Sequence, residues 1–364
     1  MLEKVATTGV DLDSVYTPTL QRIKDQKGSR SRLGMEVLMW ASHAQRPLSI
    51  DELCHVLAVD IDSTDLNSEN ITSEDTVLKS CLGLAVVDSE TLTVGLAHYT
   101  LQEYLSQPGV LPNAHRTLGQ RCLTYLNYDK VKGLPADNVS NLEDTPFLEY
   151  ASLHWGDHAK MELSDGSKSL SLKLLSEYDD HISSHILFNE IHNPYLYPFT
   201  HRPFPGLHCA AHFGIDEVVT TLIEMEGYNI NRGDSRGFTP LMHAAWRGNQ
   251  RTVALLLTRD GINPDKSDND GATPLSGASS KGNEEVVKLL LARGDVKPNT
   301  PDNYGRTPIW YASDLGNEGV VRLLLARGDI DPDKPDNDCK TPLDIASEGE
   351  RWQIEELLES RATS

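Results

Sequence analysis

The sequence has few cysteines, and none of them lie close together. The five residues Cys54, Cys81, Cys122, Cys209 and Cys339 are each separated by more than 20 positions. No CxxC pair occurs and the total is odd, so a disulfide framework is not indicated. We predict reduced thiols in the core of an intracellular protein.

Targeting and membrane signals are also missing. The first residues, MLEKVATTGVDLDS, lack the basic start and apolar run of a signal peptide. No stretch approaches the roughly 18 apolar residues that a membrane helix needs. We therefore predict an intracellular protein in the cytoplasm, with the nucleus left open, and no membrane partner.

We also expect no sequence motif for nucleotide binding or for ester hydrolysis. The G-x-x-x-x-G-K-[ST] loop that cradles nucleotide phosphates is absent. We also expect no G-x-S-x-G nucleophile elbow, and we predict that the chain is not an enzyme. We predict no cofactor and no ATP or GTP binding by this chain; calorimetry showing micromolar nucleotide affinity would contradict this.

Basic residues are scarce relative to acidic ones. The net charge is −21, with 15 Lys and Arg against 28 Asp and Glu in residues 1–200 and 18 against 26 in residues 201–364. A chain that is acidic throughout repels phosphate backbones and anionic membranes. This balance favours protein partners.

What the sequence does contain is a repeat. A Thr-Pro pair begins at Thr239, Thr273, Thr307 and Thr341, in steps of 34 residues. One step further back, LHCAAHFG follows Pro205 and aligns with LMHAAWRG at 241–248. Threonine caps a helix and proline suits its first turn, so each pair predicts a short helix, followed by a second helix and a turn-rich finger. A fixed period of this size predicts a stacked solenoid.

These motifs resemble the ankyrin repeat, whose pattern is G-x-T-P-L-H-x-A-A-x-x-G followed by V-x-L-L-L. The period here is 34 where the family has 33, and the signature histidine survives only as His208. The resemblance implies an α-solenoid with β-turn fingers over residues 201–364. We expect five repeats, at about 202–236, 237–270, 271–304, 305–339 and 340–364.

The resemblance also implies a concave binding surface, formed by the finger tips and by the two residues after each Ala-Ala pair. Aromatic and arginine side chains dominate binding energy at interfaces. Trp310 and Tyr311 could form the floor of this surface, or they could fill space left by Ser276 and Gly277. The predicted contacts to a protein ligand are Arg236, Phe238, Trp246, Arg247, Asp270, Lys281, Tyr304, Arg306, Trp310, Tyr311, Asp314, Leu315, Asp338 and Lys340.

The first part of the chain has a different character. The pattern predicts a helix over 31–44, a second helix capped by Ser49 and Glu52, a third over 74–82, a hairpin around Asp88 and a short helix at 99–107. This is the order of a winged helix. We expect a mainly α protein that combines this module at 31–107, a helical spacer at 108–200 ending in a Pro-rich joint at 192–206, and the solenoid.

The motifs RPLSIDELCHVLAV and GLAHYTLQEYL resemble the winged helix, named after GPI inositol-deacylase, that follows the NACHT domain in fungal NLR-like (STAND) signalling proteins. Residues 1–30 would then be a NACHT-proximal helical linker. The resemblance implies a C-terminal piece of a larger switch, or a shortened gene product, in which the repeats sense a ligand in innate-immunity-like signalling.

Two alternatives use other residues. The winged helix could bind nucleic acid as a regulator, but residues 46–60 are net acidic, whereas phosphate contacts need Lys or Arg. Two histidine pairs with a spacing of four, His154 with His158 and His181 with His185, could hold a metal. The first pair has no intervening glutamate and no nearby cysteine, so we predict core or surface histidines and no metal site.

Overall fold

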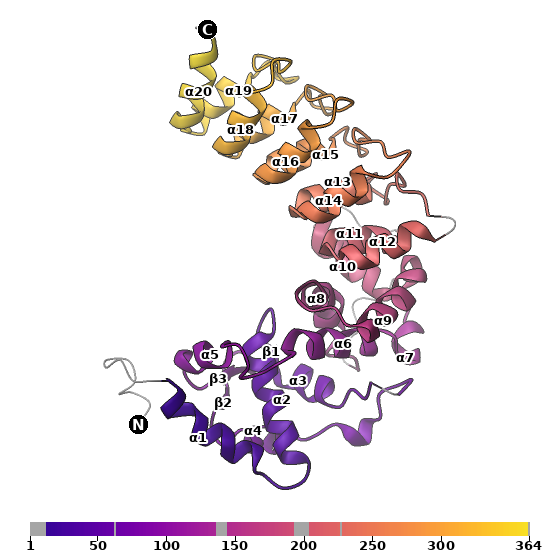
Figure 1. The fold of residues 1–364 in the computed structure, drawn as a ribbon, viewed down its shortest axis with the longest axis vertical. Helices are drawn as coiled ribbons and strands as arrows, with labels where there is room; N and C mark the ends of the chain where they lie inside the picture. The colour runs from indigo at the N-terminus through magenta and orange to yellow at the C-terminus, as the bar shows by residue number, and fades with distance from the viewer. Residues whose placement is uncertain (1–11, 62, 136–143, 193–203, 226–227, 363–364) are drawn as a thin grey trace. The chain divides into compact units, whose positions relative to one another are not determined.

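The computed structural model describes residues 12–61, 63–135, 144–192, 204–225 and 228–362. The chain divides into two compact units, Met1–Leu174 with Asp180–His201 and Leu175–Asp179 with Arg202–Ser364. Most of the expected joint at 192–206, the expected start of the first repeat at 202 and the first eleven residues of the expected linker lie outside the described residues. Figure 1 gives the order of the elements within each unit.

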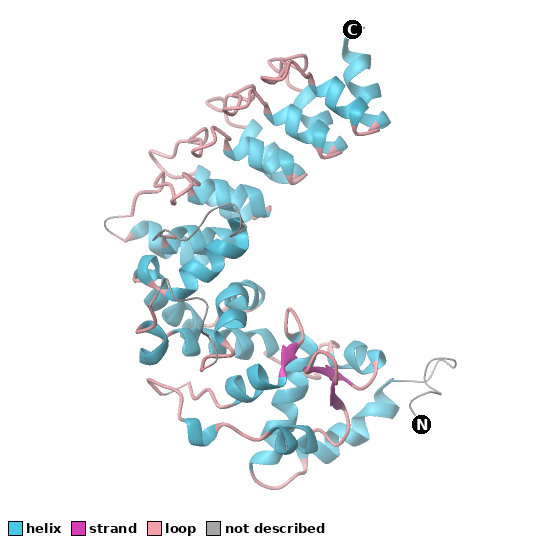
Figure 2. Cartoon of the chain, turned by 180° about the vertical axis from the view of Figure 1, so that it is seen from behind, coloured by secondary structure: helices cyan, strands magenta, loops and turns pink. Residues whose placement is uncertain are grey.

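The first unit begins with short helices around a small sheet, coloured magenta in Figure 2. The elements are α1 (Leu12–Lys24), α2 (Ser29–His43), β1 (Leu48–Ser49), α3 (Ile50–Leu57), a 3-10 turn (Ser68–Asn70), α4 (Glu74–Ser80), β2 (Ala85–Val87), β3 (Thr93–Leu96) and α5 (Tyr99–Leu105). The predicted order of helices and hairpin is confirmed. Helix α1, in the expected linker, contacts α2 and α5.

Local chemistry explains these boundaries. The Ser49 hydroxyl accepts a hydrogen bond from the Glu52 N–H while the Glu52 carboxylate accepts one from the Ser49 N–H, so the predicted capping box starts α3. The strand order is β1-β3-β2, with both pairs antiparallel. Val94 on β3 lies opposite Leu48 and Val87 and is buried between them.

The described residues of the expected spacer are mostly helical. Its helices are α6 (Ala114–Leu126), α7 (Asp129–Lys132), α8 (Leu148–Met161), α9 (Asp165–Ser176), a 3-10 turn (Tyr178–Asp180) and α10 (Ile182–His192). Helices α6 and α8 pack together closely. Trp40 of α2 contacts Phe147 and Tyr150 edge-on, at 5.6 and 5.8 Å between ring centroids. The aromatic core of the first unit therefore joins α2 to the spacer helices.

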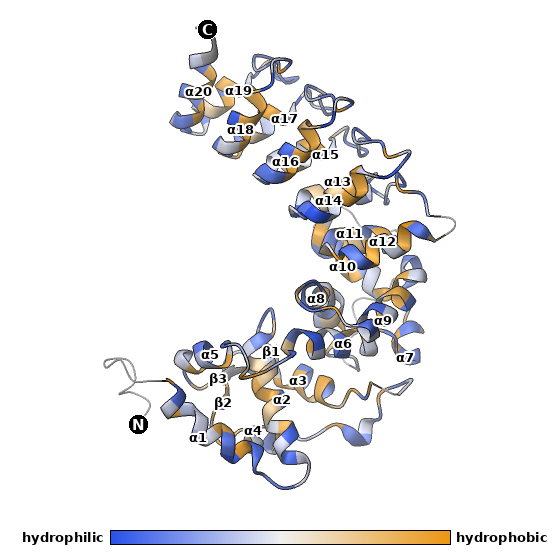
Figure 3. Ribbon diagram, in the orientation of Figure 1, coloured by the Kyte–Doolittle hydropathy of each residue, from blue (hydrophilic) through white to orange (hydrophobic). Residues whose placement is uncertain are grey.

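The second unit is a row of helix pairs (Figure 1). The first helices of the pairs are α11 (Gly206–Phe213), α13 (Pro240–Arg247), α15 (Pro274–Ser280), α17 (Pro308–Asp314) and α19 (Pro342–Glu348). The second helices are α12 (Asp216–Glu224), α14 (Gln250–Leu257), α16 (Glu284–Leu291), α18 (Glu318–Leu325) and α20 (Trp352–Ala362). Figure 3 shows hydrophobic residues gathered on the helices, which also carry hydrophilic segments, while the loops are mostly hydrophilic.

The predicted helix starts are confirmed. Thr239, Thr273, Thr307 and Thr341 each stand at the N-cap, each accepts a hydrogen bond from the backbone N–H three residues later, and each is followed by proline in the first turn. This arrangement satisfies donors that a helix start leaves open. The 34-residue step thus sets where every first helix from α13 onward begins.

A second set of recurring residues joins neighbouring pairs. The Asn249 amide donates to the carbonyls of Ala211 and His212, at 2.9 and 2.7 Å, and Asn283 and Asn317 make the equivalent bonds one and two repeats later. Each asparagine therefore satisfies carbonyls at the end of the preceding first helix. These bonds fix the stacking of one pair on the next.

The cysteine prediction needs one correction. Cys54, Cys81, Cys122 and Cys209 are buried, as expected, and all five thiols are free. Cys339 is exposed, because it lies in the tip of the last finger with a φ of 63°. Over the residues that the structure describes, no helix combines the length and apolar character needed to span a bilayer.

Candidate protein-binding surface

Each finger from the second repeat onward is built on an aspartate. Asp234, Asp268, Asp302 and Asp336 are 34 residues apart, and the Oδ1 atom of each accepts backbone N–H groups two and four residues later, at 2.8–3.0 Å. The carboxylate replaces the hydrogen bonds that the tight turn lacks. These aspartates were not predicted from the sequence, although their spacing repeats the Thr-Pro period.

Neighbouring fingers are hydrogen-bonded to each other. The backbone N–H of Asn269 donates to the carbonyl of Arg236 at 2.9 Å, and Asn303 and Asn337 donate to Asp270 and Tyr304 at 2.8 Å. Gly237 has a φ of 82°, and a Cβ there would come within 2.8 Å of the Asn269 nitrogen. The glycine therefore allows this close approach, and the fingers form a continuous row (Figure 2).

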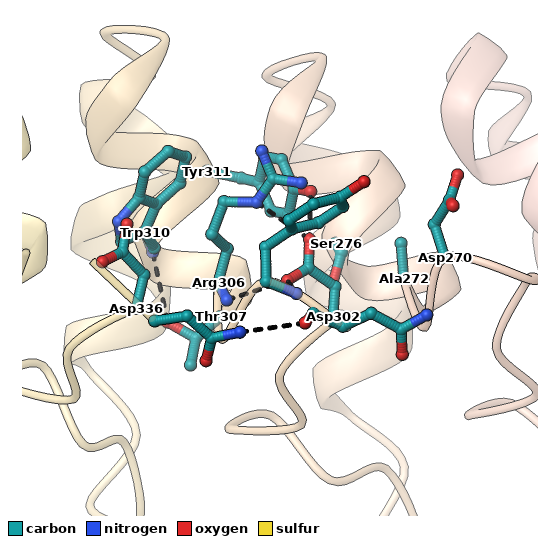
Figure 4. A network of polar contacts seen from close by, with 12 residues as sticks. Asp270, Ala272, Ser276, Asp302, Arg306, Thr307, Trp310, Tyr311 and Asp336 are labelled. Carbon is teal, nitrogen blue, oxygen red and sulfur yellow. Dashed lines mark hydrogen bonds and ion pairs between the residues drawn. The ribbon is translucent and has the colours of Figure 1, made fainter. Parts of the chain in front are cut away.

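The fourth repeat carries a cluster around Asp302. Its Oδ2 atom accepts hydrogen bonds from Arg306 Nε at 3.0 Å and from the Tyr311 hydroxyl at 2.6 Å, and Figure 4 shows both side chains converging on it. The guanidinium carbon of Arg306 lies 4.4 Å from the centroid of the Tyr304 ring and 5.1 Å from that of Tyr311. Burial, followed by the Asp302 carboxylate, raises the pKa of Tyr311. The cluster is therefore rigid and internally paired.

The outer edge of this cluster is open to solvent. Tyr304 is 55% exposed, and Leu315, at the C-terminal end of α17, is 51% exposed. In the second repeat Trp246 is half-buried, and the Lys281 ammonium lies 4.2 Å from its ring centroid. Two aromatic rings with a cation on their face are thus presented along one row.

The remaining predicted contacts occupy varied positions. Arg236 pairs with Asp270 at 3.1 Å and lies 5.6 Å from the Phe238 ring centroid, whereas Lys340 pairs with Glu348 at 2.6 Å. Arg247 and Asp338 are exposed and Asp314 is half-buried. We call the following set the finger face: Arg236, Phe238, Trp246, Asp270, Lys281, Tyr304, Arg306 and Tyr311.

Comparison with known protein families assigns both parts of this architecture. The family model described as ankyrin repeats (3 copies) matches residues 207–302 and 260–336. Residues 207–336 are ankyrin repeats. The model described as the GPI inositol-deacylase winged helix domain matches residues 22–113. A search of curated proteins found no match.

Within the ankyrin array, Trp310 belongs to the core. Its side chain is 8% exposed, and its indole N–H has no acceptor among the described residues. The ring lies 5.5 Å from the Arg306 guanidinium carbon and meets Tyr311 edge-on. The sequence left open whether Trp310 and Tyr311 form the floor of a binding surface or fill space in the core. Most of the Trp310 side chain packs in the core, and Tyr311 is the more accessible of the two.

The histidine pairs are core residues for the most part. His158 is fully buried, with Nδ1 at 3.0 Å from His115 Nδ1 and Nε2 at 2.9 Å from the Tyr150 hydroxyl. His181 is buried, and its Nε2 lies 3.0 Å from the carbonyl oxygen of Leu126. Within the described segments, no group of three or more potential ligands is placed to hold a metal ion.

The expectation about G-x-S-x-G was wrong at the level of sequence. Residues 233–237 read GDSRG and match the spacing. They form the second ankyrin finger, however, where Asp234 closes the turn and Ser235 Oγ is buried with no hydrogen-bond partner among the described residues. A nucleophile elbow needs a strand-to-helix turn that exposes the serine to a base. This finger lacks that geometry.

Proposed function

We propose that the finger face of the ankyrin array binds a protein partner. The observation that carries the proposal is the pair of cation-covered aromatic rings, Tyr304 and Trp246, displayed on a row of hydrogen-bonded fingers. Rigid aromatic anchors lose little conformational entropy on binding and contribute much of the energy of an interface. Ankyrin repeats suggest protein–protein interaction in general; the finger face is our assignment of where it happens in this chain.

We further propose a signalling role for the whole chain. The winged helix and the ankyrin array stand in the order found in NLR-like proteins, where the repeats sense a ligand and the winged helix couples it to a nucleotide switch. In this proposal the chain is a non-catalytic sensor and coupling segment, in the manner of fungal NACHT–ankyrin proteins. It binds no nucleotide through its own residues, because the phosphate loop is absent from its sequence.

Site-directed crosslinking would locate the partner on the array. A photoreactive amino acid at position 304 or 281 should form adducts with a partner protein. The same group at Lys288, an exposed position on α16 away from the fingers, is the matched control. Crosslinks that form equally well from position 288 would contradict the assignment of the finger face.

We expect Tyr304→Ala to weaken partner binding by at least about five-fold, which is about 1 kcal/mol. Its melting temperature should change little, because exposed substitutions usually stay within about 0.5 kcal/mol. Trp352→Ala is the control, since Trp352 on α20 is also a highly exposed aromatic but lies outside the finger face. Titration calorimetry and melting curves on each variant would separate binding from stability.

Trp246→Ala is a less clean probe than Tyr304→Ala. The ring is half-buried and stacks on His212 with 6.5 Å between centroids, so its loss should cost some stability as well as affinity. Trp310→Ser should lower both stability and partner affinity. The loss of stability should be the larger one, because the indole is buried. If Tyr304→Ala binds normally but melts early, Tyr304 has a structural role and the finger face is wrongly assigned.

Nucleic-acid binding through the winged helix is the second candidate, and its surface charge argues against it. Helix α4, the third helix of the module, carries Glu74 and Asp75 in its first turn, and its Lys79 pairs with Asp75 at 2.5 Å. The hairpin turn between β2 and β3 holds Asp88 and Glu90. These side chains would face phosphates at close range. A salt-dependent gel shift with duplex DNA would favour this candidate.

A further inference from the structure

The second oxygen of the finger aspartate has a side-chain partner in the second and fourth repeats. Asp234 Oδ2 lies 2.9 Å from His243 Nε2, and Asp302 Oδ2 accepts the Tyr311 hydroxyl at 2.6 Å. In both cases the partner stands nine residues after the aspartate, on the first helix. The equivalent residue of the third repeat is Gly277, which has no side chain.

Asp268 is therefore left with half of its hydrogen bonds. Its Oδ1 atom accepts the N–H groups of Asp270 and Ala272, at 2.9 and 2.8 Å, but no donor among the described residues reaches Oδ2. The carboxyl is half-buried, and this burial raises its pKa to about 6. A partly desolvated carboxylate oxygen that accepts no hydrogen bond from the protein lowers the stability of the folded state, and a bound cation would offset this cost.

The space at Gly277 is open and has an aromatic wall. A Cβ built on Gly277 would have Trp246 Cδ1 as its nearest neighbour, at 3.9 Å, which is ordinary van der Waals contact. The cations nearby are already engaged: Arg236 pairs with Asp270 and Lys281 lies on the Trp246 ring. Because His243 and Tyr311 reach their aspartates from the equivalent position, we expect Asp268 Oδ2 to face this space. We call the space between Asp268, Gly277 and Trp246 the notch.

We propose that the notch receives an arginine or lysine side chain of the protein partner, which donates to Asp268 Oδ2 while its stem or guanidinium packs against Trp246. This rests on the proposed function, because it names the chemistry that the finger face would recognise. Charge complementarity supports a cationic occupant, since the chain carries a net charge of −21 and attracts basic partners over long range. Carboxylate and aromatic face together suit a guanidinium.

A peptide display library provides the test without knowledge of the natural partner. Peptides selected on the full wild-type chain should carry arginine or lysine at one fixed position. Asp268→Asn keeps an oxygen for the two finger N–H groups but removes the charge, and it should weaken the selected peptides at least tenfold. Asp336→Asn is the matched control, because Asp336 closes the same turn in the fifth repeat, where buried Ile345 stands in place of Gly277. The affinity of Asp336→Asn for the selected peptides should equal that of the wild type.

Two substitutions at Gly277 probe the space itself. Gly277→His supplies an internal partner like His243 and should reduce peptide affinity at least tenfold while the array stays folded by melting curve. Gly277→Ala adds only a methyl group that fits, so binding should survive. If Asp268→Asn destabilised the finger, Gly277→His would still test the notch, because it leaves the aspartate in place.

Acidity gives an independent readout. Protonation of Asp268 removes the charge that the cation needs, so wild-type affinity for a histidine-free peptide should fall as the pH drops from 7 to 5. The groups facing Asp268, which include Arg236, Asp270 and Tyr311, are retained in Asp268→Asn. The pH dependence should therefore disappear in that variant if it comes from Asp268.

The outcomes separate the two proposals. Selected peptides that need Tyr304 but show no basic preference, or that bind Asp268→Asn as well as wild type, overturn the notch and leave the finger face intact. Peptides that bind Tyr304→Ala and Trp246→Ala normally overturn the finger face itself. A basic position together with losses in Asp268→Asn and Gly277→His, but not in Asp336→Asn, supports the notch. If the same peptides also lose affinity for Tyr304→Ala, both proposals are supported.

Discussion

Leu290→Ala and Leu324→Ala are each expected to lower the free energy of unfolding of the ankyrin array by about 2–5 kcal/mol. Both side chains are 0% exposed, on the equivalent helices α16 and α18. Helix α16 packs against α14 and α18, so truncating Leu290 leaves a cavity between three repeats. Hydrogen exchange of amides in these helices would measure the loss.

The neighbouring leucines provide the control. Leu289 and Leu323 precede the buried residues by one position and are only half-buried. Their replacement by alanine should cost less than half as much, because less apolar surface is returned to water. Each repeat depends on its neighbours, so faster exchange should spread along the array. An equal rise in exchange rate within residues 29–105 would contradict the view that each repeat depends mainly on its neighbours.

Acidification is expected to destabilise the first unit through His158. Burial, followed by the nearby His115, lowers the pKa of His158 to about 3, against an ordinary value of 6.5. The folded state therefore binds fewer protons than the unfolded state. The stabilisation is complete above pH 6.5 and is lost as the pH falls towards 3. Between pH 7 and pH 5 the loss from this one group is about 2 kcal/mol.

Hydrogen exchange of α8 peptides at several pH values would measure this loss. His158→Gln should lower stability at pH 7, because it disturbs the contacts with Tyr150 and His115. It should also weaken the dependence of the first unit's stability on pH, since the titrating group is gone. His43 and His115, whose pKa values are also lowered by burial, remain in the variant and account for the residual slope. A slope unchanged by His158→Gln would show that other groups control acid unfolding.

The exposure of the predicted contact residues was anticipated only in part. Tyr304, Leu315 and Arg247 are exposed as their positions in the repeat implied. Trp310 was predicted as a contact beside them, but its indole is buried. The finger aspartates were not predicted at all. Whether an aromatic residue beside a helix start points into the core depends on its neighbours in the adjacent repeat, and periodicity along one repeat carries no such information.

The sequence by itself determined the array, the helix starts and the order of the first module. These follow from local or periodic signals: the 34-residue step, the threonine at the N-cap of each first helix from α13 onward, and the Ser49 capping box. Only the tertiary structure decided which polar atoms lack partners. Asp234, Asp268 and Asp302 look alike in sequence, yet His243 and Tyr311 satisfy two of them and Gly277 leaves the third open, because hydrogen bonding depends on side chains that packing brings within about 3 Å.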